Sequence, residues 1–244
     1  MTNTLADYDP LLAAAAFAVA MLGAFAGFFA GRYVRDDAGR IRMPWLVLSA
    51  LALSACMMWA THFVAMLAYE PGVAYTFGVE RTLLSLAMSA IFSVFAVLIV
   101  TRHPGSTAVL VVGGATMAMG IVALHYGGMA ALRVPRETVH HAGLAGVSIV
   151  IAFAVSTWAL HVLTRVTHRG RYLAVPLMAA AVCAMHFTGM AGLRIGAEQP
   201  VAYFAGAITS GLMGILVAAI ALVTALLAAA LGVIGYLESS RRAA

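Results

Sequence analysis

Seven long apolar runs constrain the fold of this chain more than any other feature. A helix that crosses a membrane needs about 20 consecutive, mostly apolar residues, and seven segments reach this length. The runs are continuous rather than alternating in polarity, which excludes the strands of a transmembrane barrel, and only helices then satisfy the backbone in lipid. The sequence therefore predicts an all-α polytopic membrane protein. The predicted spans are 11–30, 44–68, 82–101, 107–132, 144–164, 173–193 and 207–236.

Composition supports this class. Charged residues make up only 9% of the chain, whereas a soluble domain carries about 25%. The first run follows Asp7 and Asp9 with no preceding Arg, so we expect a retained helix rather than a signal peptide. There is no Lys, which excludes a retinal protein, because retinal attachment needs a lysine amine. The net charge of +5 comes from arginines spread over short loops, and we expect no nucleic-acid partner.

The arginines predict an orientation, because their numbers alternate from loop to loop. One set of loops and the C-terminal tail hold ten arginines, and the other set holds four. Cytoplasmic loops are enriched in basic residues, so we expect the N-terminus outside and the C-terminus inside. The ten are Arg32, Arg35, Arg40, Arg42, Arg102, Arg165, Arg169, Arg171, Arg241 and Arg242, and the four are Arg81, Arg133, Arg136 and Arg194.

Three short segments repeat one pattern: a histidine, an aromatic residue, two small or medium residues, and a methionine. The histidine of the second copy, His125, lies 63 residues after His62, and His186 lies 61 residues after His125. This spacing matches a helix pair with its loops, so the pattern predicts three helix-pair repeats and a final helix in one domain, 1–244. We expect no separate soluble output domain. The repeats are 11–68, 82–132 and 144–193, and the final helix is 207–236.

The repeated histidines are candidate metal ligands. Each lies six or seven residues before the end of its span, which places all three about 9–10 Å inside the predicted outer face. A histidine inside a membrane faces the bundle interior or a cavity, and each methionine lies one turn further along the same helical face. Imidazole and thioether together suit copper, with zinc as an alternative. The candidate ligands are His62, Met66, His125, Met129, His186 and Met190.

Two further features of the motif stay open at this point. The aromatic residues Phe63, Tyr126 and Phe187 either line the site or anchor the helices at the membrane interface. A site built on three histidines also fits a haem-binding redox protein or a metal or proton transporter.

The segment Met185-His186-Phe187-Thr188 resembles the signature of the MHYT family of bacterial membrane sensor domains. The resemblance covers nearly the whole chain: the helix count, three motif copies on alternate helices, and their common depth. In the other copies Thr61 and Leu124 stand where the signature has its leading methionine, so the shared candidates are the histidines and trailing methionines.

The resemblance implies a multi-pass sensor in the bacterial inner membrane that binds copper and, through it, a diatomic gas such as oxygen, carbon monoxide or nitric oxide. Many members continue into an output domain. We therefore expect a signalling role without enzymatic activity here, with the lipid bilayer, a metal ion, a gaseous ligand and a separate signalling protein as partners.

Overall fold

The computed structural model describes residues 7–198 and 207–243 and confirms an all-α polytopic fold. Seven helical segments in this part of the chain are long and apolar enough to cross a membrane. The first span is α1 (Pro10–Ala30), extended by the 3₁₀ turn η2 (Gly31–Tyr33). The second consists of α2 (Met43–Leu51), the π-helical segment η3 (Ala52–Ala60) and α3 (Thr61–Ala68). The others are α4 (Val79–Arg102), α5 (Thr107–Ala131), α6 (Ala142–Arg165), α7 (His168–Ala191) and α8 (Ser210–Ala243).

Most predicted boundaries differ from the structure by a few residues, and two of these differences have a clear structural cause. Helix α7 begins at His168, five residues before the predicted sixth span. Its first turns are held by Arg171, which donates hydrogen bonds to the carbonyls of Phe28 (3.1 Å) and Leu163 (2.8 Å). The last helix begins at Ser210 rather than residue 207, because Ala207 pairs with a neighbouring strand. The length of an apolar run reports hydrophobicity alone, so it shows neither the hydrogen bonds of Arg171 nor the strand pairing of Ala207.

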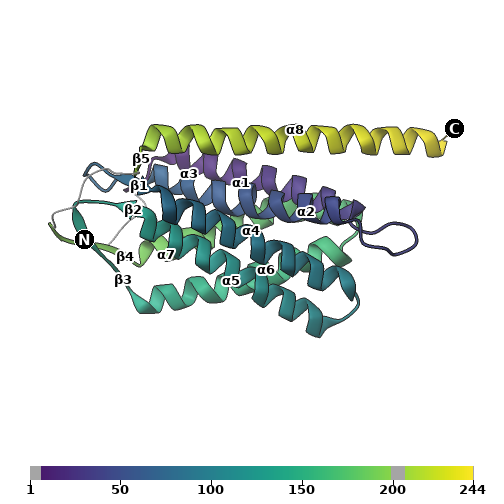
Figure 1. The fold of residues 1–244 in the computed structure, drawn as a ribbon, viewed down its shortest axis with the longest axis horizontal. Helices are drawn as coiled ribbons and strands as arrows, with labels where there is room; N and C mark the ends of the chain where they lie inside the picture. The colour runs from purple at the N-terminus through teal and green to yellow at the C-terminus, as the bar shows by residue number, and fades with distance from the viewer. Residues whose placement is uncertain (1–6, 199–206, 244) are drawn as a thin grey trace.

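Five short strands, which the sequence analysis did not predict, lie at one end of the bundle (Figure 1). Strand β1 (Thr76–Gly78) pairs antiparallel with β2 (Leu132–Arg133) and β5 (Ala207–Ile208). Strand β3 (Arg136–His140) pairs antiparallel with β4 (Leu193–Glu198). We call this the strand-bearing end. The C-terminus lies at the opposite end, as an odd number of spans requires.

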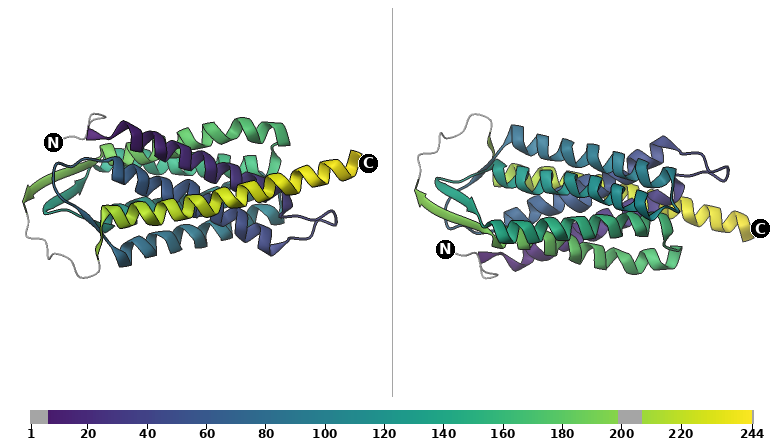
Figure 2. Two further views of the ribbon diagram at one scale, coloured as in Figure 1. Left: turned by 90° about the horizontal axis from the view of Figure 1, so that it is seen from above. Right: turned by 90° about the horizontal axis from the view of Figure 1, so that it is seen from below.

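The second span forms the centre of the bundle. It is 83% buried over its most apolar window, against 17–44% for the other six spans, and the two views of Figure 2 show the remaining helices arranged around it. Helix α1 approaches it through two glycines. A Cβ at Gly23 would lie 2.6 Å from the Cα of Met57, and one at Gly27 would lie 2.6 Å from the Cγ of Leu53. Small residues allow such close helix contact in lipid.

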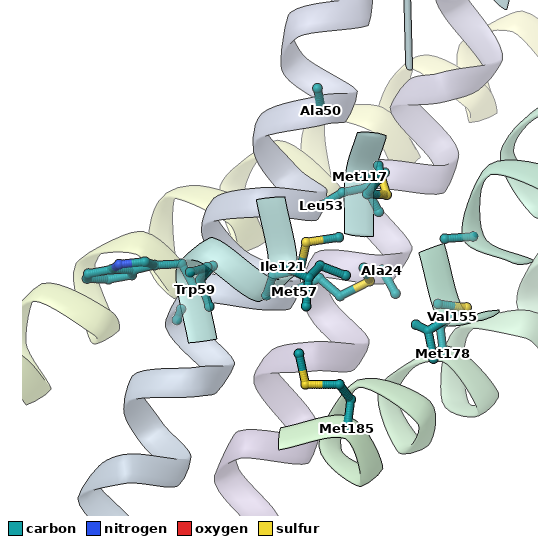
Figure 3. Packing of buried hydrophobic residues seen from close by; sticks show 14 of the residues in the cluster. Ala24, Ala50, Leu53, Met57, Trp59, Met117, Ile121, Val155, Met178 and Met185 are labelled. Atoms are coloured by element: carbon teal, nitrogen blue, oxygen red, sulfur yellow. The ribbon is translucent and has the colours of Figure 1, made fainter. Parts of the chain in front are cut away.

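The core continues from this central span toward the end opposite the strands. It is apolar and rich in methionine, and Figure 3 draws part of it with Met57, Met117, Met178 and Met185 labelled. Helix α4 joins the bundle through its serine stripe, since Ser85 and Ser89 face the helix that carries Gly120 and Gly127. The apolar outer faces of α4, α6 and α8 remain exposed for lipid.

Candidate metal site

Three helices bring the repeated histidines together. His62 lies on α3, His125 on α5 and His186 on α7, each five or six residues before the helix ends at the strand-bearing end. Their exposed fractions are only 2%, 1% and 3%. The three side chains lie at one depth, as the sequence predicts, and the structure shows that they converge.

The three rings present the same nitrogen to one another. The Nδ1 atom of His62 lies 3.0 Å from Nδ1 of His186 and 3.3 Å from Nδ1 of His125. One ring nitrogen from each histidine lies within 4.8 Å of those of the other two. Each pair of rings is close to perpendicular, at 80–90°, with centroids 4.9–5.2 Å apart. The arrangement is a triangle of donor atoms with an approximate threefold relation that follows the sequence repeat.

Small residues of the repeat make this approach possible. Gly128, three residues after His125, lies against the His62 ring, and a Cβ there would collide with Nε2 and lie 2.9 Å from Cδ2 of that ring. Gly189, three residues after His186, bears the same relation to the ring of His125, with Cδ2 3.0 Å from the Cβ position. The rings of His62 and His125 thus each pack against the helix that carries the next copy of the motif.

The aromatic residue after each histidine packs edge-on against it. The ring centroids of the pairs formed by Phe63, Tyr126 and Phe187 with their histidines are 4.9, 4.9 and 5.2 Å apart. These rings also contact the segments at the strand-bearing end: Phe63 meets Phe77, Tyr126 meets His140, and Phe187 meets Tyr8. The aromatics therefore cover the histidines on that side, which favours the first of the two roles left open by the sequence.

This cover is electrically neutral at Tyr8. Burial, followed by the nearby Tyr69 and Asp7, raises the pKa of the Tyr8 hydroxyl above its usual value of 10. Tyr126 is held in place because its hydroxyl lies 2.7 Å from the Ser148 hydroxyl on α6. The histidines are thus separated from the loops by an aromatic layer.

A small cavity lies on the other side of the histidines. Its volume is about 20 Å³, enough for roughly one water-sized molecule. Figure 3 shows three of its lining residues, Ile121, Val155 and Met185. Each motif copy contributes the residues one and four positions before its histidine, and α6 adds two more. These residues are Met58, Thr61, Ile121, Leu124, Val182 and Met185, with Ala152 and Val155.

The geometry suits a metal ion. Donor nitrogens about 2.0 Å from a shared metal in a trigonal or tetrahedral site are about 3.3–3.5 Å apart, close to the two Nδ1 separations of 3.0 and 3.3 Å. A neutral imidazole that offers Nδ1 to a metal carries its proton on Nε2. All three Nε2 atoms are buried and without a hydrogen-bond partner among the described residues, so no neighbour fixes the opposite tautomer.

The structure adds residues that the sequence analysis did not include among the candidate ligands. Met58 and Met185 line the cavity beside the histidines, whereas the predicted ligands Met66, Met129 and Met190 are buried but do not line it. Met185 and Met58 lie one and four residues before their histidines. Positions with this spacing share one helical face, so the sequence alone could have indicated them. The contributions of Ala152 and Val155 come from a helix without the motif and had no such signal.

Comparison with known proteins identifies the family. The family described as "Bacterial signalling protein N terminal repeat", MHYT, matches residues 58–113, 119–175 and 180–244, three ranges that each begin shortly before a motif histidine. The chain belongs to the MHYT family. Its seven apolar helices and this membership make it a multi-pass protein of the bacterial inner membrane.

Relatives of this MHYT chain are longer signalling proteins. It is 32% identical to the bifunctional diguanylate cyclase/cyclic di-GMP phosphodiesterase MucR of Pseudomonas aeruginosa, over 89% of this chain and 33% of that protein. It is 33% identical to the cyclic di-GMP phosphodiesterase NbdA of the same species, over 76% of this chain and 24% of that protein. It is 33% identical to an uncharacterized signaling protein of Caulobacter vibrioides, over 80% of this chain and 24% of that protein.

The MHYT chain therefore spans between a quarter and a third of the length of these relatives. No solved structure matches it.

Proposed function

We propose that this MHYT domain is a membrane-embedded sensor that binds one copper ion through the Nδ1 atoms of His62, His125 and His186. The observation that carries the proposal is the convergence of these three atoms in a buried site. A metal ion would satisfy all three lone pairs at once, which no arrangement of the rings alone achieves. Burial among apolar residues favours a ligand set of neutral imidazoles.

Copper is proposed over zinc because each histidine has a methionine one turn further along its own helix, and two more methionines line the adjoining cavity. Side chains on a helix lean toward its N-terminus, so Met66, Met129 and Met190 lean back toward the histidines one turn before them. Met58 and Met185 approach from the cavity side. Thioether sulfur favours Cu(I) over zinc, and imidazole binds copper as well as zinc. We propose the three trailing methionines as exchangeable additional ligands, of which one at a time completes a four-coordinate site and gives way to a gas molecule.

The sensed molecule is proposed to be a small neutral gas: oxygen, carbon monoxide or nitric oxide. Bound Cu(I) would supply an acceptor for such a molecule. The cavity beside the histidines has room for roughly one. Apart from the three histidines, its lining is apolar with Thr61 as the one further polar side chain among the described lining residues, and a cavity of this size and character admits a neutral gas more readily than a hydrated ion.

The geometry disfavours the other two functions left open. Pockets for ligands of drug size occupy about 300–1,000 Å³, so the cavity of about 20 Å³ leaves no room for haem between histidine rings 4.9–5.2 Å apart. Transport of protons or ions across the bundle needs polar groups along a path. Among the described residues, the buried polar side chains beyond the cavity are serines and threonines, with no buried Asp, Glu, Arg or further His to continue a path.

The output of the sensor is proposed to lie outside this domain. The names of MucR and NbdA assign them cyclic di-GMP synthesis or hydrolysis, while this chain spans a quarter to a third of their length. We propose that the MHYT domain itself performs no catalysis. It would pass its state to such an enzyme in the same chain or in a partner protein.

The copper site is tested by metal content. Purified parent protein should hold one copper per chain, His125→Ala should hold none, and Met129→Ala should retain copper with lower affinity, because three imidazoles complete a site without sulfur. Elemental analysis after expression with equal copper and zinc provides the measurement. His103→Ala is the matched control, since His103 caps the end of α4 that lies away from the strand-bearing end and the histidine site. Equal copper in the parent and His125→Ala would refute the site.

The gas site is tested by filling the cavity. Val155→Phe places a large ring in the lining without removing a proposed ligand, so copper content should remain and carbon monoxide binding should fall by at least about tenfold. The infrared stretch of bound carbon monoxide in copper-loaded protein reports this. Val150→Phe is the control because Val150 is 67% exposed on the same helix. Equal binding by both variants would remove the cavity from the proposal.

A further inference from the structure

Each aromatic residue that covers a motif histidine packs in turn against a residue of the strand-bearing end. Two of these outer neighbours are Phe77, which is completely buried, and Tyr8, which is partly buried. The third is His140 on β3, which is exposed and packs against Tyr126. Within the described part of the chain, His140 is thus the one outer neighbour that is exposed and has a side-chain nitrogen able to bind a metal ion.

His140 is linked to the candidate metal site through the Tyr126 ring. The ring centroids of His140 and Tyr126 lie 5.7 Å apart, with an angle of 69° between the ring planes. The centroids of Tyr126 and His125 lie 4.9 Å apart, with an angle of 86°. The Tyr126 ring therefore contacts two imidazoles, one that is exposed and one that faces the other motif histidines. His140 is also close enough to His125 for the two to interact electrostatically.

The His140 side chain is well placed to accept a metal ion from the aqueous side. It is exposed on a strand outside the membrane-spanning helices. Partial burial lowers the pKa of the His140 ring below its usual value of 6.5, which favours the neutral imidazole, the form that binds metal ions. The adjacent His141 has a different role, because its Nδ1 accepts a hydrogen bond from the Leu144 amide (3.4 Å) and caps α6.

The aromatic layer would open at Tyr126 with less disruption than at Phe63. The Phe63 side chain is completely buried, so moving it would rearrange the core. Tyr126 is partly exposed, and it is held by its hydroxyl, which lies 2.7 Å from the hydroxyl of Ser148 on α6. A hydrogen bond in a folded protein contributes only modestly to stability. Rotation of the Tyr126 ring away from His125 therefore requires no unfolding of the bundle.

We propose that His140 is an entry ligand, which binds a metal ion first at the strand-bearing end and passes it beneath a displaced Tyr126 ring to His125. The inference rests on the proposed function, since it assumes that the motif histidines hold the metal. The transfer is a ligand exchange: the metal–nitrogen bond to His140 breaks as one to His125 forms, and no electron or proton is gained or lost. Three ligands acting together hold the ion more tightly than one, so transfer proceeds inward.

The test measures how fast the whole metal-free chain, in maltoside detergent, takes up copper from the Cu(I)–bicinchoninate complex, whose visible absorbance falls as copper leaves. His140→Leu should slow uptake by about tenfold or more, because an ion held beside the site enters it at a raised effective concentration. The final copper content and the affinity should equal those of the parent. Release of copper to excess bicinchoninate should therefore slow by the same factor.

His140→Met is the second variant, because a thioether side chain of nearly the same size as leucine also binds Cu(I). It should take up copper at close to the parent rate, which separates metal binding by residue 140 from packing against Tyr126. His141→Leu is the control at the adjacent position, and it should also load like the parent.

The possible outcomes separate this inference from the proposed function. Equal uptake rates in the parent and His140→Leu would overturn the entry role, as would equally slow uptake by His140→Leu and His140→Met. A lower final copper content in His140→Leu would make His140 a ligand of the final site and would also overturn the entry role. A parent chain that binds no copper at equilibrium would refute the proposed function, and the entry role with it.

Discussion

The third residue after each motif histidine controls how closely the neighbouring histidine can approach. Gly128 and Gly189 leave space that the rings of His62 and His125 occupy, whereas the first copy has Ala65 at this position. Glycine in a helix interior costs about 0.5–1 kcal/mol relative to alanine. Its presence at these two positions is explained by the ring that each one receives, and this makes the two glycines positioning residues for the proposed metal site.

This role predicts an effect of a single methyl group. Gly128→Ala should displace the His62 ring and reduce copper affinity by about tenfold or more, because a shift of even a few tenths of an ångström separates the three Nδ1 atoms from a common ion. Copper titration of the purified, metal-free protein measures the change. Circular dichroism of the same sample should show unchanged helix content, so that a folding defect is distinguished from a local one.

The adjacent glycine supplies the control. A Cβ at Gly127 would meet only the Cβ of Ser85 at 3.6 Å, an ordinary contact. Gly127→Ala should therefore bind copper like the parent. A similar loss in both variants would show that the helix, rather than the His62 ring, is sensitive to substitution.

At the scale of elements, the second span differs from the other two that carry the motif. Its middle is the π-helical segment η3, which ends immediately before Thr61 and His62, whereas α5 and α7 are continuous α-helices. The Thr61 hydroxyl donates a 3.3 Å hydrogen bond to the carbonyl of Cys56, five residues earlier. π-helical turns are rare and occur frequently at functional sites. The wider turns set the direction in which His62 leaves the central span.

The packing of α1 on this segment predicts a stability effect. Gly23→Ala should lower Tm in detergent and destabilise the protein by about 1–3 kcal/mol, because the added methyl group overlaps the backbone of Met57 and the helices must separate. Gly214→Ala on α8 meets nothing within 4 Å. Its Tm should be equal to or slightly above that of the parent, since alanine favours a helix. A lower Tm in Gly214→Ala alone would contradict the assignment of the tight contact to α1.

At the scale of the whole molecule, the structure has two different ends. The strand-bearing end holds the histidines and the aromatic layer, and the opposite end holds the arginine-rich loops. A bundle whose histidine site lies near one face is suited to receive a signal from that side of the membrane. Which side this is rests on the arginine asymmetry.

The asymmetry predicts the orientation of the chain. A reporter fused after Ala244 should be active in the cytoplasm, and one inserted near Gly196 in β4 should report the outside, because ten arginines lie on the C-terminal side and four on the other. Paired alkaline phosphatase and green fluorescent protein fusions measure both sites. The opposite pattern at both positions would invert the bundle and place the histidines at the inner face.

The sequence alone was sufficient for the seven spans, the threefold repeat and the common depth of His62, His125 and His186, because hydrophobic length and helical rise are properties of a single helix. It also carried the family signature. Whether the three rings would meet, and through which nitrogen, depended on how α3, α5 and α7 pack, since contacts between helices are set by the shapes of partners far apart in the chain.

Only the tertiary structure therefore revealed the roles of Gly128 and Gly189, the cavity lined by Met58 and Met185, and the strands at one end. The π-helical segment was also revealed only by the tertiary structure, because a change from i→i+4 to i→i+5 hydrogen bonding leaves no mark on an apolar run. Thr76 on β1 and its partner Arg133 on β2 lie 57 residues apart in sequence. They meet because β1 and β2 pair, and backbone hydrogen bonding between distant strands is a property that no local pattern in these short loops encodes.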